Sequence, residues 1–86
     1  MYRQSAQASA HAELPVDDVL LTVRQVMVIT GLSRSSIYSF MHARTFPLPV
    51  PVGGRAVRWS LKEVRCWIAE RVALRDANAR KRALIR

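Results

Sequence analysis

The stretch TVRQVMVITGLSRSSIY, residues 22–38, decides the fold, because one glycine separates two short patterned segments. Thr22 and Ser33 are residue types that cap helix N-termini, and Gly31 suits the left-handed position that follows a helix. The pattern predicts one helix between Thr22 and Gly31 and a second that begins after Ser33. The apolar residues recur at helical spacing and form the expected buried faces: Val23, Val26, Met27 and Thr30, widened by Val28 and Ile29, in the first, and Ile37, Phe40 and Met41 in the second.

Only three residues lie between the two predicted helices, which is typical of a helix-turn-helix. An ordinary helical hairpin gives the same pattern, so residues 22–41 alone leave both architectures open. The outer face of the second helix is small and polar, with one aromatic and one basic side chain: Arg34, Ser35, Tyr38, Ser39 and His42.

The next segment, FPLPVPV at residues 46–52, has prolines at alternate positions, which exclude a helix and a central strand but permit an extended edge. Gly53 and Gly54 indicate a tight turn before RAVRW, residues 55–59. We therefore expect a two-stranded hairpin with an arginine at its tip.

A third helix follows, because Ser60 and Glu63 have the spacing of a capping box. It is expected to extend to about residue 78 and to bury an apolar face, with the two tryptophans most simply explained as core: Trp59, Leu61, Val64, Trp67, Ile68 and Val72. Residues 1–18 are expected to be a disordered tail, residues 19–78 one domain, and residues 79–86 a frayed basic tail.

Charge is distributed unevenly along the 86 residues. Fourteen Lys and Arg oppose six Asp and Glu, for a net charge of +8, and no acidic residue lies between residues 19 and 62. Such an excess repels itself unless a polyanionic partner compensates it, although a solvated surface explains any single charge.

Several classes of function find no support in the composition. The single cysteine excludes an internal disulfide and a multi-cysteine zinc site, and no apolar run reaches the length of a membrane helix. No catalytic constellation, metal site or phosphate-binding loop is visible. We expect a cytoplasmic, nucleoid-associated protein that is not an enzyme and has no cofactor or metal.

Four blocks together resemble a known family: residues 21–26, residues 30–38, residues 46–47 and residues 53–59. In order and spacing they are similar to the AlpA family of phage and prophage DNA-binding regulators, which are akin to MerR-like excisionases. The resemblance spans residues 20–72 and implies a winged helix-turn-helix, mainly α-helical with a small β-hairpin.

The resemblance implies binding to double-stranded DNA, with the second helix in the major groove and the hairpin wing on the backbone or the minor groove. The family's contact positions correspond to two groups here, Arg34, Ser35, Ser36, Tyr38 and Ser39 in the helix and Gly53, Gly54, Arg55 and Arg58 in the wing. Two departures reduce the expected contacts. Leu48 and Pro51 occupy a strand that is often basic in the family, and Ser39 occupies a position that is often basic.

Three roles remain open at this stage. The protein is a transcriptional regulator, an excisionase-type factor that bends DNA for recombination, or a basic module for an acidic protein or membrane surface. The first two imply RNA polymerase or an integrase as a partner on the DNA. A short helix reads few bases, so a homodimer or cooperative multimer is expected on DNA.

Overall fold

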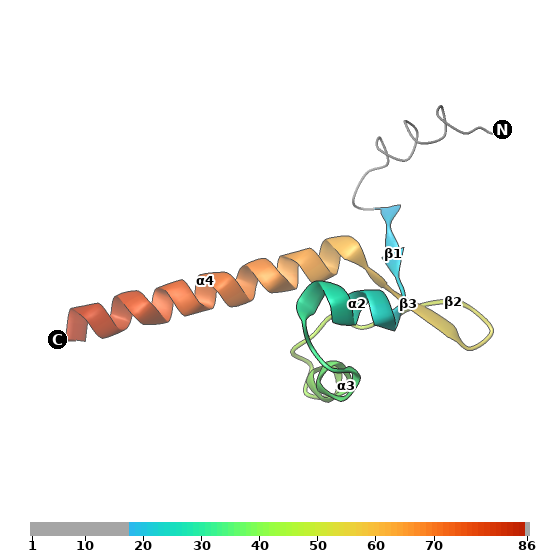
Figure 1. Ribbon diagram of the computed structural model, residues 1–86, viewed down its shortest axis with the longest axis horizontal. Helices are drawn as coiled ribbons and strands as arrows, with labels where there is room; N and C mark the ends of the chain where they lie inside the picture. Colours follow the sequence, from blue (N-terminus) through green and yellow to red (C-terminus); the bar gives the residue numbers. More distant parts are fainter. Residues whose placement is uncertain (1–17, 86) are drawn as a thin grey trace, which may run out of the picture.

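The computed structural model describes residues 18–85, and Figure 1 shows their arrangement. The predicted N-terminal tail therefore lies, up to residue 17, outside the described residues. In chain order the elements are β1 (Leu20–Leu21), α2 (Val23–Thr30), α3 (Arg34–His42), β2 (Val50–Gly53), β3 (Ala56–Ser60) and α4 (Leu61–Ile85). The predicted fold class is confirmed, since three helices accompany a small antiparallel sheet in the manner of a winged helix-turn-helix.

The first two helices, α2 and α3, each begin after a residue whose side chain caps the N-terminus. Gln25 N donates to Thr22 Oγ1 at 3.2 Å, while Thr22 N donates to Gln25 Oε1 at 2.8 Å, which completes a capping box. Ser36 N donates to Ser33 Oγ at 3.1 Å and caps α3. Gly31 ends α2 with a φ of 75°, a left-handed conformation that glycine adopts at little cost. The predicted caps and turn are confirmed.

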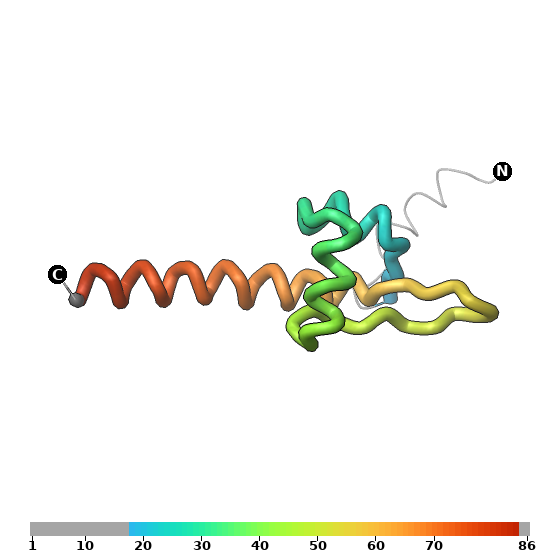
Figure 2. The backbone as a smooth tube through the Cα atoms, turned by 90° about the horizontal axis from the view of Figure 1, so that it is seen from below, coloured from blue at the N-terminus to red at the C-terminus, as the bar shows by residue number. Residues whose placement is uncertain are grey.

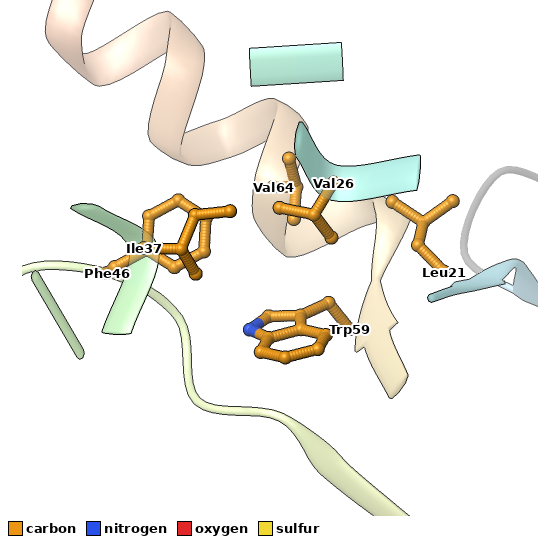
Figure 3. Packing of buried hydrophobic residues seen from close by; sticks show 6 residues of the cluster. All are labelled: Leu21, Val26, Ile37, Phe46, Trp59 and Val64. Carbon is orange, nitrogen blue, oxygen red and sulfur yellow. The ribbon is translucent and has the colours of Figure 1, made fainter. Parts of the chain in front are cut away.

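One hydrophobic core joins all three helices to the sheet (Figure 3). Trp59 is fully buried, and its Nε1 donates to Pro47 O at 3.2 Å, so the indole satisfies its donor inside the core. The sequence pattern did not single out Phe46, which is buried and packs edge-on against Trp67, with ring centroids 4.9 Å apart. The buried cluster consists of Leu21, Val26, Ile37, Phe46, Trp59 and Val64.

Three expectations about buried faces are wrong. Val28 is 83% exposed and Ile29 41% exposed, because α2 is covered along one side and Val26 occupies that side. Phe40 is also exposed, and its ring lies 6.3 Å from that of Trp67, which packs more closely against the buried Phe46. Val72 is 44% exposed and lies at the rim of a surface hollow that Leu32 and Phe40 also line, where α4 leaves the body of the domain.

The sheet has the order β1-β3-β2, and both pairs are antiparallel. The predicted hairpin is confirmed as β2 and β3, with Pro51 in the edge strand β2. The strand β1 was not predicted. Its two residues pair with the end of β3, Leu20 opposite Ser60 and Leu21 opposite Trp59, and so add a third strand to the expected two.

The helix α4 continues through residues 79–85, where the sequence led us to expect a frayed tail. Ser60 Oγ accepts a hydrogen bond from Glu63 N at 3.2 Å, as the predicted cap requires. Only the first part of α4 packs on the body, and the remainder projects into solvent (Figures 1 and 2). The radius of gyration is 17.2 Å, against about 12 Å for a compact chain of this length.

Candidate nucleic-acid interface

The outer face of α3 carries most of the helix positions predicted to contact DNA. Ile37 is fully buried and fixes which side of α3 meets the core. Arg34, Ser35 and Ser39 are consequently exposed. Ser36 is half-buried, and its Oγ lies 3.0 Å from the Ser33 hydroxyl, which donates to it. Ser36 therefore contributes to the cap, while the other positions form an accessible polar surface.

Tyr38 connects this surface to the core. Its side chain is 43% exposed, and its ring meets Trp59 edge to face, with centroids 6.3 Å apart and planes at 83°. A contact of this geometry holds an aromatic ring in a defined orientation. Tyr38 can thus present a positioned phenol on the outer face of α3.

The hairpin begins next to α3, and its tip points away from the body (Figure 2). Gly53 pairs with Ala56, so Gly54 and Arg55 form the two-residue turn. Gly54 has a φ of 54°, and positive φ at the first turn residue is the pattern of a type II′ turn. Arg55 is exposed at the tip. Arg58 is half-buried, and its Nη1 donates to the carbonyl of Val57 at 2.8 Å.

The C-terminal end of α3 holds a feature that the sequence pattern missed. Arg44 has a φ of 66°, a left-handed conformation that is usually adopted by glycine when it follows a helix end. Thr45 N donates to Phe40 O at 2.8 Å, and Arg44 N donates to Met41 O at 3.0 Å, which are the two bonds of a Schellman motif. The sequence signals this left-handed residue only weakly, because no glycine follows His42 to mark the end of the helix. Arg44 adds an exposed cation at this end of α3.

The outer face of α3 and the hairpin both expose arginines. Arg34, Arg44, Arg55 and Arg58 form no ion pair with another described residue. No acidic residue occurs in the sequence between residues 19 and 62, which includes both elements. A surface with this charge and with small polar groups suits phosphate contacts.

Other kinds of site find no support in the described part of the chain. Among residues 18–85, no group of three His, Cys, Asp or Glu side chains is placed to hold a metal ion. Cys66 is exposed and is not in a disulfide. No helix in that range is long and apolar enough to cross a membrane.

Comparison with known proteins identifies relatives over the same residues. The family model described as prophage CP4-57 regulatory protein (AlpA) matches residues 19–72. A protein of Enterobacteria phage P4, described as uncharacterized protein ORF88, is 41% identical over 64 residues, which are 70% of this chain and 73% of that protein. No solved structure matches the chain significantly.

Proposed function

From the premise that this chain belongs to the AlpA family of phage regulatory proteins, we propose that it binds double-stranded DNA in a sequence-specific manner and regulates transcription. The observation that carries the proposal is that the outer face of α3 and the tip of the hairpin expose arginines that form no ion pair with another described residue. No enzymatic step is part of this function.

In the proposed complex, α3 enters the major groove, which is wide enough for an α-helix. Arg34 lies in the first turn of α3, where the helix dipole disfavours a cation, so its position is better explained by a partner than by stability. Its guanidinium is suited to bidentate contact with a guanine edge. Tyr38, one turn later, offers a hydroxyl on the same side of the helix.

The hairpin then contacts the DNA beside the groove. Arg55 at the turn reaches a phosphate or the narrow minor groove, whose negative potential attracts arginine. The glycines of the turn allow the backbone to approach closely. Arg58, partly engaged by the Val57 carbonyl, supplies a second charge near the backbone.

One copy reads a short site. The nine residues of α3 span about 13 Å, or about four base pairs. Specific binding therefore requires two or more copies on neighbouring sites. The partner on that DNA distinguishes the two possible roles of the protein. RNA polymerase at a promoter indicates a transcriptional regulator, and an integrase at an attachment site indicates a recombination factor.

The proposal is tested by selecting duplexes from a random pool and measuring Kd on the best site and on random DNA. Arg34→Ala should cost about 1–3 kcal/mol on the best site and less on random DNA. Arg55→Ala should weaken both equally and reduce the slope of log K against log salt by about 0.9.

The matched control is Arg65→Ala on α4, which removes one exposed charge outside the proposed surface. Equal effects of Arg34→Ala and Arg65→Ala would show that α3 has no special role. Failure of the wild-type protein to bind any duplex would remove the proposed function.

A further inference from the structure

The C-terminal part of α4 is a helical arm that projects from the body of the domain (Figures 1 and 2). We define the arm as residues 71–85, and every arm side chain described is exposed. An isolated helix of about 15 residues is marginal in water, so the arm gains little stability from itself. Its direction is opposite to that of the hairpin, with α3 between them (Figure 2).

The side of α4 that is buried and apolar near its start is basic in the arm. Arg71 lies two turns after the buried Val64 and therefore points to the same side of the helix. Arg75 follows one turn later, and Arg82 two further turns along. These three arginines span about 16 Å on the side of α4 where the body of the domain lies.

The arginines of this face are only lightly engaged. The guanidinium of Arg71 lies 5.9 Å from the ring centroid of Trp67. Arg75 Nη2 lies 2.8 Å from Asp76 Oδ1, but both side chains are more than half exposed, so water and salt weaken this pair. Arg82 forms no ion pair with another described residue.

We propose that this basic face of the arm binds the backbone of the duplex that flanks the α3 site, on the side away from the hairpin. The inference rests on the proposed function and extends its contact surface. Asn78 lies on the same face between the arginines, and Arg and Asn are both residue types that contact phosphates.

The composition of the face favours a nucleic-acid backbone over a protein. A protein interface needs a buried aromatic or apolar anchor, and residues 71, 75, 78 and 82 supply none. Leu74 borders the face beside Arg71 and Asn78 as a single exposed apolar side chain, and Leu84 lies on another side of the helix. A second copy of the arm is disfavoured because like charges would oppose one another.

The position of the arm also predicts the shape of the bound DNA. In Figure 1 the helix α4 lies above α3, so the arm is set back from the level of α3. A straight duplex on α3 would pass below the arginines. The flanking duplex therefore curves toward the arm when it binds, and loss of the arm contacts straightens it.

The test compares two triple variants that each remove three positive charges from α4. The first is Arg71→Gln, Arg75→Gln and Arg82→Gln. The control is Arg65→Gln, Arg80→Gln and Lys81→Gln, whose exposed side chains lie on other sides of the helix. Circular dichroism checks the fold of both, and Gln suits helix surfaces nearly as well as Arg.

Each protein is titrated with a short duplex limited to the α3 and hairpin contacts and with one extended by a helical turn on either side. The first variant should bind the long duplex more weakly, with the salt slope reduced by up to about 2.7, and should match wild type on the short duplex. It should also bend the long duplex less, as measured by energy transfer between its labelled ends. The control should keep the bend and the full difference between the duplexes.

Equal behaviour of the two triple variants would overturn the inference, because the arm would then act only through net charge. Binding of the long duplex by the first variant with wild-type affinity would also overturn it. If the first variant bound polyglutamate more weakly than wild type but bound both duplexes normally, the face would be assigned to an acidic protein. If wild type binds no duplex, the proposed function itself has failed. If only Arg34→Ala weakens binding, the function stands without the arm.

Discussion

The helices α2 and α3 have nearly the same construction and very different outer surfaces. Each is short, begins at a hydroxyl cap and inserts one fully buried residue, Val26 in α2 and Ile37 in α3. Both helices expose an arginine in the first turn, Arg24 in α2 and Arg34 in α3, but beyond it α2 exposes the apolar Val28, whereas α3 exposes serines. The comparison teaches that similar caps and core anchors can support helices whose outer faces differ, and the contact role proposed for α3 rests on its outer residues.

The largest effect is expected from removing the anchor of α3. Ile37→Ala deletes a fully buried side chain and should destabilise the protein by about 2–5 kcal/mol, which is a large share of the stability of a small domain. Thermal unfolding followed by circular dichroism measures the loss. Ile37→Val, the control, should lose only about 0.5–1.5 kcal/mol. A similar loss for both variants would mean that α3 does not depend on this packing.

Loss of the caps should have the next largest effect and should separate the two helices by function. Thr22→Ala and Ser33→Ala should each cost about 1 kcal/mol, or about 4–8 °C in Tm. Only Ser33→Ala should also weaken DNA binding, because it loosens the first turn of α3, which carries Arg34. Equal DNA affinity of the two folded variants would contradict the different roles given to α2 and α3.

Arg44→Gly should raise stability by about 0.5–1 kcal/mol. Glycine takes the left-handed conformation at the end of α3 without the steric cost that arginine bears, although it loses more backbone entropy on folding. Chemical denaturation with an unchanged m-value gives the difference. Arg44→Gln, which keeps the strained conformation but removes the charge, is the control, and an equal stability gain in that variant would point to charge relief.

The smallest effect is expected on the outer face of α2. Val28→Ser replaces a side chain that is 83% exposed, so stability should stay within about 0.5 kcal/mol. DNA affinity should match wild type in the same titrations. A marked loss of affinity would show that α2 contacts the duplex too, and the division between the two helices would then need revision.

The sequence predicted those parts of the fold that are determined locally. The caps Thr22 and Ser33, the turn at Gly31 and the hairpin at Gly54 each depend on conformational preferences of single residues and their neighbours. The strand β1 was missed because two residues carry no periodicity, and their pairing with β3 depends on contacts nearly 40 positions away. Phe46 was missed as a core residue for the same reason, since its neighbour Trp67 lies on a distant helix.

The candidate site was predicted less completely than the fold. Helical spacing correctly left Arg34 and Tyr38 on the outside of α3, and the turn residues left Arg55 at the tip. The conformation of Arg44 depends on how α3 ends, which a pattern of residue types does not encode. The contact roles themselves stay predictions, because exposure and charge show only that these side chains are available.

The edge strand β2 has a further consequence for how the protein behaves at high concentration. Its outer side exposes Val50 and Val52, and an apolar strand edge is a template on which another chain can add as a β-strand. Pro51 lies between them and has no amide hydrogen to donate, which interrupts the row of groups that such a chain would need. Pro51, which also departs from the family pattern, thus makes the edge of the hairpin a poorer template for the addition of another strand.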